Sequence, residues 1–267
     1  MNLNITIGQY YPASSKIHSL DPRTKLLALF VFIIILFSAP NAFGYVVSAL
    51  GLFGVILMSK VPVKFMLKGL RNVFFIIIFT VVLNVFFVPG ETVLFQLGFL
   101  RVTLEGLFAA ARMACRLVLL IIASSVLTLT TSPIELTDGI EHALKPFKKI
   151  GVPAHEIAMM MTIALRFIPT LMEETDRIMK AQISRGADFG SGNLVQKAKA
   201  IIPLLVPLFI SAFRRADELA LAMESRCYRG DENRTRMKVL KRGRIDYIFY
   251  LSLILFGACV YFTRFLL

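Results

Sequence analysis

Long uncharged stretches alternate with basic stretches along this chain. Residues 26–59 carry no charged side chain and are broken once, at residues 38–41 (Ser-Ala-Pro-Asn), which is a turn signature. We expect two membrane helices there, joined by a tight hairpin. With the later apolar runs, the pattern predicts five spans, at residues 26–37, 42–58, 72–88, 117–131 and 247–262. The fourth is expected to be the end of a longer helix that starts near Thr103.

Residues 132–245 show helical periodicity instead. Ser132 followed by Pro133 is typical of a helix start, and residues 154–184 and 193–225 predict two long amphipathic helices, the first kinked at Pro169. Residues 201–213 are uncharged, but the stretch is short and holds two prolines. We therefore expect a cytoplasmic or interfacial helix there, with a sixth span as the open alternative.

The composition places the chain in a membrane. Of its 267 residues 57% are apolar, the mean hydropathy is +0.71, and the net charge is +13. A soluble domain is less apolar than this, so a soluble secreted protein is excluded. With this hydropathy, the positive charge indicates membrane lipids as partners and no nucleic acid.

The basic residues also set an orientation. Most of the 30 Lys and Arg residues fall on one side of the predicted spans. The positive-inside rule then predicts a multi-pass protein of the cell (cytoplasmic) membrane with the N-terminus and residues 132–245 in the cytoplasm. The expected fold is all-α, an integral membrane protein with about five transmembrane helices and a cytoplasmic helical domain with long amphipathic helices. The expected regions are a cytoplasmic N-terminal segment (1–25), transmembrane helices 1–4 (26–131), cytoplasmic helices (132–245), and a C-terminal transmembrane helix (246–267).

Motifs for catalysis are missing from the sequence. The three cysteines have no zinc-site spacing, His155-Glu156 has no second histidine at metalloprotease spacing, and there is no phosphate-binding GxxxxGK[ST] loop. We expect no metal site, no catalytic residue and no cofactor bound by this chain, so that any ATP must be hydrolysed by another chain.

One twelve-residue pattern occurs twice, 41 residues apart. Residues 175–186 read TDRIMKAQISRG and residues 216–227 read ADELALAMESRC, each with Arg near a helix end. An Arg before Gly186 is a common helix C-terminal signature. The alternative is a subunit contact, because a small Ala one turn earlier lets a helix tip enter a groove while the guanidinium binds carboxylates.

At this point the sequence resembles a known family, the transmembrane T component of energy-coupling factor (ECF) transporters, which are vitamin and micronutrient importers driven by ABC ATPases. The resemblance covers nearly the whole chain. It is carried by GQYYPASSKIHSLDPRTKLL at residues 8–27, AQISRGADF at 181–189, IPLLVPLFISAFRRADELALAMESRCYRG at 202–230, and the terminal span.

The resemblance implies a non-catalytic coupling subunit, with two ABC ATPase subunits, non-identical like the two motifs, and one or more substrate-binding S components as partners. ATP would be bound on the partner subunits. The family's two Ala-Arg-Gly-type motifs fall on residues 184–186 and 225–227, with Ser in place of Ala in both and Cys in place of Gly in the second. The implied ATPase-coupling residues are Ala181, Ser184, Arg185, Gly186, Ala222, Ser225, Arg226 and Cys227.

Two further sets are candidates for contact with an S component or for helix packing within the chain. Gly106, Ala110 and Ala114 have the small-xxx-small spacing that lets helices approach closely in lipid. Met160 and Met161 lie on an amphipathic helix, and methionine is frequent both in cores and at surfaces that accept several partners.

Two other functions compete with the coupling role. An integral-membrane enzyme acting on lipid or polyprenyl substrates would need a cluster of carboxylates or histidines, for which Asp138, Glu141 and His142 are the one loose candidate. A conventional ABC permease half would bind its substrate without an S component.

Overall fold

The computed structural model describes residues 10–39, 41–97, 100–187, 189, 193–230, 240 and 242–263. The chain forms two compact units, residues 1–139 with 239–267 (unit 1) and residues 140–238 (unit 2). Unit 1 contains α1 (Pro22–Ser38), α2 (Ala42–Ser59), α3 (Val63–Phe87), β1 (Val93–Leu97), β2 (Leu100–Thr103), α4 (Leu104–Thr130) and α8 (Arg244–Phe262). The chain passes into unit 2 within α5 (Pro133–Leu144) and continues through the 3-10 helix η1 (Lys145–Ile150), α6 (Ala154–Ser184) and α7 (Leu194–Ser225).

The predicted all-α membrane fold is confirmed. Within the described residues, α2, α3, α4 and α8 are long and apolar enough to cross a membrane. Helix α1 contains the first of the five predicted spans. It has 17 residues and is therefore one residue shorter than α2, the shortest of those four helices. The domain boundaries expected at residues 132 and 245 stay predictions.

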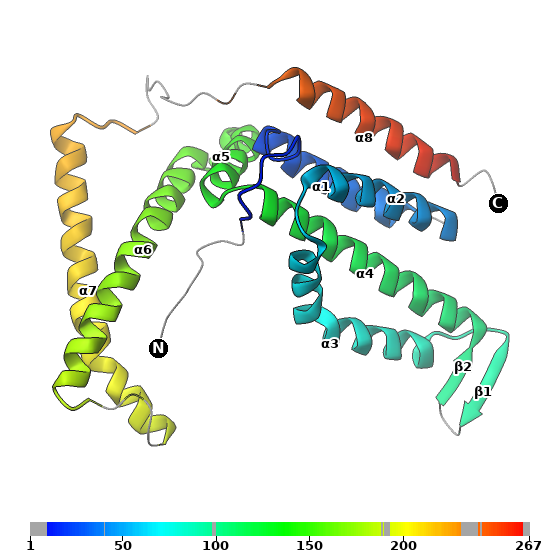
Figure 1. The fold of residues 1–267 in the computed structure, drawn as a ribbon, viewed down its shortest axis with the longest axis horizontal. Coiled ribbons are helices and arrows are strands. Elements are labelled where there is room, and N and C mark those ends of the chain that lie inside the picture. Colours follow the sequence, from blue (N-terminus) through cyan, green and yellow to red (C-terminus); the bar gives the residue numbers. More distant parts are fainter. Residues whose placement is uncertain are drawn as a thin grey trace. The chain divides into compact units, whose positions relative to one another are not determined.

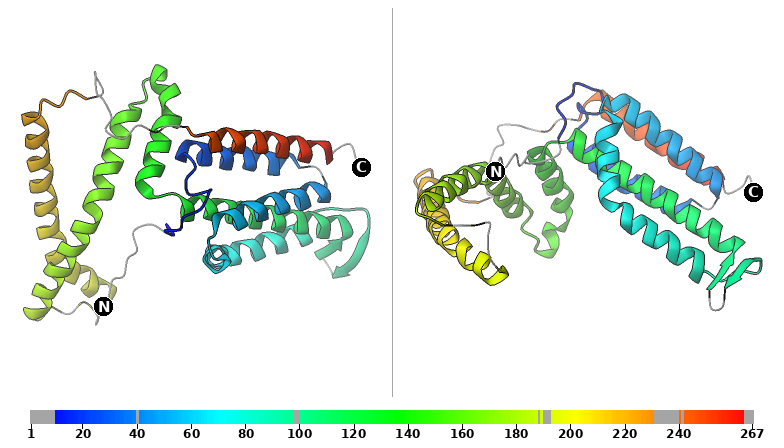
Figure 2. Two further views of the ribbon diagram at one scale, coloured as in Figure 1. Left: turned by 45° about the horizontal axis from the view of Figure 1, so that its top comes forward. Right: turned by 60° about the horizontal axis from the view of Figure 1, so that its bottom comes forward.

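The core of unit 1 lies among α1, α2, α4 and α8, which run side by side (Figures 1 and 2). Its buried side chains come from all four helices and include Leu36, Tyr45, Leu52, Leu119 and Val260. Helix α3 packs mainly against α4, and large apolar side chains such as Phe75 and Phe87 stay exposed. Exposure of this kind carries no penalty when lipid is the solvent.

Helix α3 begins at Val63, nine residues before the predicted third span. Its first turns carry Lys64, Lys68 and Arg71, which fall between the second and third predicted spans. Residues spaced by four and three positions share one face of a helix, so these cations form one polar face on an otherwise apolar helix.

The hairpin β1–β2 between α3 and α4 was not predicted. Val93–Leu97 pairs with Leu100–Thr103 in antiparallel fashion. A glycine between two short apolar runs is its sequence signal, and that signal is weak beside the two long helices that flank it. The long fourth helix that was expected from near Thr103 is confirmed, because Thr103 caps α4 by accepting a hydrogen bond from the Gly106 amide (3.1 Å).

The two long helices expected in unit 2 are confirmed. Helix α6 has the predicted bounds, and α7 starts one residue after the predicted position. Both continue through internal prolines, Pro169 in α6 and Pro203 and Pro207 in α7. Residues 201–213 therefore lie inside α7, which is not among the helices apolar enough to cross a membrane.

Candidate functional site

The end of α6 is closed by a Schellman motif. The amide of Gly186 donates to the carbonyl of Ile183 (2.9 Å), and the amide of Ala187 donates to the carbonyl of Gln182 (3.0 Å). Gly186 has a φ of +88°, the left-handed conformation this closure requires and which glycine adopts without strain. Arg185 is the residue at the cap. The helix thus stops abruptly with an arginine at its tip.

The end of α7 has the same closure. The amide of Cys227 donates to the carbonyl of Glu224 (2.9 Å), and the amide of Tyr228 donates to the carbonyl of Met223 (3.1 Å). Cys227 takes the left-handed position, with a φ of +55°. The departure from glycine in the second motif therefore leaves the helix ending intact, and Arg226 holds the same place as the first motif's arginine.

The side chains of the two motifs face outward. Both arginines and both small residues one turn earlier, Ala181 and Ala222, are exposed. Each serine bonds back to its own helix: Ser184 Oγ donates to the Lys180 carbonyl (3.1 Å), and Ser225 Oγ donates to the Ala222 carbonyl (3.0 Å). Each guanidinium group thus belongs to an exposed tip whose serine hydroxyl and two of whose terminal carbonyls are bonded within the same helix end.

Helices α6 and α7 pack in antiparallel fashion. Arg215 Nη2 lies 2.9 Å from Glu174 Oε2, and just beyond the end of α7 the Tyr228 hydroxyl donates to the sulfur of Met159, near the start of α6 (3.0 Å). The second arginine motif is therefore beside the start of α6, and the first is at its end. From residue 159 to residue 185 a helix rises about 39 Å. The two motifs are held apart and do not form a single site.

The contacts that fix this pairing were not predicted. The Arg215 guanidinium bonds to Glu174 and lies 6.0 Å from the centre of the Phe167 ring. Opposite charges on two amphipathic helices are too frequent for the sequence alone to pair them.

One of the small residues of α4, Gly106, lies close to α3. Gly106 and Ala110 are buried, and Ala114 is half-buried. A Cβ placed on Gly106 would lie 3.2 Å from the Val85 carbonyl oxygen and 3.4 Å from that of Asn84. Glycine thus lets the two backbones approach closely at this point. A seat for an S component on this stripe stays a prediction.

The methionines lie in unit 2, near the start of α6. Met160 is 59% exposed and Met161 is 37% exposed.

Helix α7 also carries an apolar stripe on one face, with exposed side chains at a spacing of three and four. These are Ile201, Ile202, Leu205, Val206, Phe209, Ile210 and Phe213.

The residues that the enzyme hypothesis needs make other contacts. Glu141 is buried, and its carboxylate lies 3.3 Å from His155 Nδ1. Over the part of the chain that the structure describes, no three His, Cys, Asp or Glu side chains gather where they could hold a metal ion.

Comparison with known proteins agrees with the geometry. Residues 13–237, which include both arginine motifs, match the family of CbiQ cobalt transport proteins. The chain is 56% identical over 262 residues to an energy-coupling factor transporter transmembrane protein EcfT of Thermosediminibacter oceani, covering 98% of each chain. It is also 61% identical over 246 residues to the EcfT of Clostridium kluyveri (92% of this chain, 91% of the relative) and 48% identical over 261 residues to that of Bacillus subtilis (98% of each).

The chain belongs to the EcfT family of ECF transporter transmembrane components. The predicted resemblance is thereby confirmed. Membership makes the chain an integral membrane component of a transporter in the cell membrane.

Proposed function

We propose that this chain is the coupling subunit of an ECF-type vitamin or micronutrient importer. Two ABC ATPase subunits dock on its two arginine-tipped helix ends, and it passes their ATP-driven motion to a separate S component that binds the substrate. ATP is bound and hydrolysed on those partners. This chain acts without catalysis and holds no cofactor of its own.

The observation that supports this most directly is the pair of matched helix ends. Each combines a Schellman closure, an exposed arginine and an exposed alanine one turn earlier. A narrow, stiff tip with a bidentate donor suits insertion into a groove lined with carboxylates. The separation of about 39 Å along α6 leaves room for one ATPase subunit at each tip. The different residues at the two tips suit two non-identical subunits.

The exposed apolar stripe of α7 supports the S component as the other partner. An apolar surface of this length, from residue 201 to residue 213, is unusual on a face that meets only water. We propose that it rests against an S component at the membrane, with the exposed methionines of α6 adding an adaptable contact. The N-terminus and residues 132–245 then lie in the cytoplasm, where the positive charge favours them.

A pull-down from the native host tests the proposal. The tagged chain is purified in mild detergent, and co-purifying proteins are identified by mass spectrometry. We expect two ABC ATPases and one or more small membrane proteins. The double variant Arg185→Glu with Arg226→Glu should lose both ATPases, while the control Arg166→Glu with Arg214→Glu, which makes the same charge change at exposed positions away from the caps, should keep them. Retention of both ATPases by the double variant would overturn the proposed docking.

A further inference from the structure

The coupling role leaves the N-terminal segment, residues 10–25, without a function. This segment lies in unit 1, next to the two points where the chain leaves that unit and returns to it. The chain departs through the end of α4 and the start of α5, and it returns at the start of α8.

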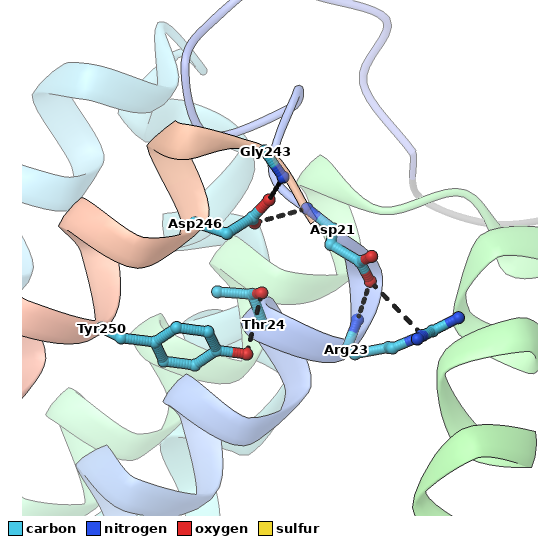
Figure 3. Close-up of polar contacts among 6 residues, drawn as sticks. All are labelled: Asp21, Arg23, Thr24, Gly243, Asp246 and Tyr250. Atoms are coloured by element: carbon cyan, nitrogen blue, oxygen red, sulfur yellow. Dashed lines mark hydrogen bonds and ion pairs between the residues drawn. The ribbon is translucent and has the colours of Figure 1, made fainter. Parts of the chain in front are cut away.

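At the point of return, one carboxylate joins two parts of the chain. Asp246, in the first turn of α8, is 3% exposed. Its Oδ1 accepts a hydrogen bond from the Asp21 amide (2.9 Å), and its Oδ2 accepts one from the Gly243 amide (2.7 Å) (Figure 3). One turn further on, Thr24 Oγ1 donates to the Tyr250 hydroxyl (3.0 Å). Two hydrogen bonds, one helical turn apart along α8, therefore join the start of α8 to the start of α1.

At the point of departure, the same segment holds the end of α4. Lys25 Nζ donates to the carbonyl of Thr130 (2.8 Å), the last residue of α4, and also to the carbonyl of His18 (3.1 Å). The amide of Tyr11 donates to the carbonyl of Leu129 (2.9 Å). These bonds satisfy two carbonyls that a helix end leaves without partners. A cation at this position also stabilises the helix, because it lies at the negative end of the helix dipole.

Charged side chains at the two attachments interact with one another. Lys25 is 6% exposed and interacts electrostatically with the carboxylates of Glu135, Asp21 and Asp246. Its ammonium group is therefore attracted by carboxylates at the starts of both α8 and α5. Moving one member of a buried group of opposite charges leaves the others without compensation, so such a group resists rearrangement.

We propose that residues 10–25 form a clasp that fixes the end of α4 to the start of α8, and that Lys25 and Asp246 are positioning residues for coupling. The inference rests on the proposed coupling function. Unit 2 is connected to unit 1 at these two places. If each connection moved freely, motion imposed on unit 2 would be absorbed there. With the clasp closed, that motion displaces α4 and α8 together.

The test measures transport and ATP hydrolysis in the same vesicles. The complete complex is reconstituted with Lys25→Met or Asp246→Asn, and substrate imported per ATP hydrolysed is recorded. We expect complexes that assemble and hydrolyse ATP, with this ratio lowered by about tenfold, which lies within the usual range of coupling between sites. Lys25→Arg should restore most of the ratio, and Lys16→Met, which removes an exposed cation of the same segment, should leave it unchanged.

Tyr250→Phe keeps the proposal testable if the buried variants fail to assemble. It removes only the hydroxyl that accepts from Thr24, and we expect a ratio lowered by about threefold, the worth of one hydrogen bond. An unchanged ratio in the assembled variants overturns the clasp while leaving the coupling role intact. A native complex without ATPases, or one that hydrolyses ATP without import, would instead refute the proposed function.

Discussion

The ends of α6 and α7 reach the same geometry by different means. Both close with the same two hydrogen bonds and both present an arginine. At the end of α6, Gly186 supplies the left-handed residue at no cost in strain. At the end of α7, Cys227 adopts that conformation although it is unfavourable for an L-residue with a side chain. The left-handed conformation costs such a residue about 1 kcal/mol or more. The next residue, Tyr228, is bonded to Met159 across the helix pair.

The comparison shows that the arginine and the closure, rather than the glycine, are what the two ends share. A local residue choice holds one end in shape. At the other, a contact between helices accompanies the strained residue. The two tips should therefore respond differently to substitution, although they look alike as backbone.

The largest difference is expected from reversing one arginine at a time. Arg185→Glu should release one ATPase subunit and Arg226→Glu the other, because the tips lie about 39 Å apart along α6 and share no partner. Turning a charge pair into a like-charge contact should cost at least about 2 kcal/mol, roughly 30-fold in affinity. The measurement is the ratio of the two ATPases in each pull-down. If each single variant lost both subunits equally, the tips would not be independent.

How much of this comparison could be predicted from the sequence depends on how far apart along the chain the interacting residues lie. The bounds of α6 and the helix stop at Gly186 follow from local signals, namely apolar periodicity and a glycine after a basic residue. The end of α7 at residue 225 was also expected from the periodicity, but nothing in the local sequence requires Cys227 to be left-handed.

Contacts between distant residues were not accessible from the pattern. Asp246 was placed next to a membrane span, but its bond to the Asp21 amide joins residues 225 positions apart. The hairpin β1–β2 and the early start of α3 were missed for a different reason: long apolar runs dominate the hydropathy of unit 1 and hide shorter signals beside them.

The next effect in size is expected from Gly186→Ala. Among the described residues other than its two chain neighbours, no atom lies within 4 Å of the position its Cβ would take, so the change acts there through the backbone conformation. Alanine at this φ should destabilise the last turn of α6 by about 1–2 kcal/mol. Amide hydrogen exchange should speed up at the end of α6 and stay unchanged at the end of α7. Equal exchange in both proteins would show that the closure does not depend on glycine.

The reverse change, Cys227→Gly, should stabilise the last turn of α7. Removing the side chain relieves the left-handed strain, and the gain should be about 1 kcal/mol, reduced by the greater freedom of glycine in the unfolded chain. Exchange at the end of α7 should slow, and both ATPases should still co-purify. Faster exchange would mean that the exposed Cys227 side chain contributes a contact that outweighs its strain.

The smallest effect is expected from Tyr228→Phe, which removes the hydroxyl that donates to the Met159 sulfur (3.0 Å) and leaves the ring in place. Because the loss is one weak hydrogen bond, the end of α7 should be destabilised by about 0.5 kcal/mol. Exchange should quicken modestly there and remain unchanged at the end of α6. Tyr247→Phe, at a position that is 61% exposed, is the matched control.

Combined with Cys227→Gly, the Tyr228→Phe change should have less effect than alone, since a relaxed left-handed residue needs less support from the neighbouring helix. If the two changes were simply additive, the strain at Cys227 and the contact at Tyr228 would be independent features of this helix end.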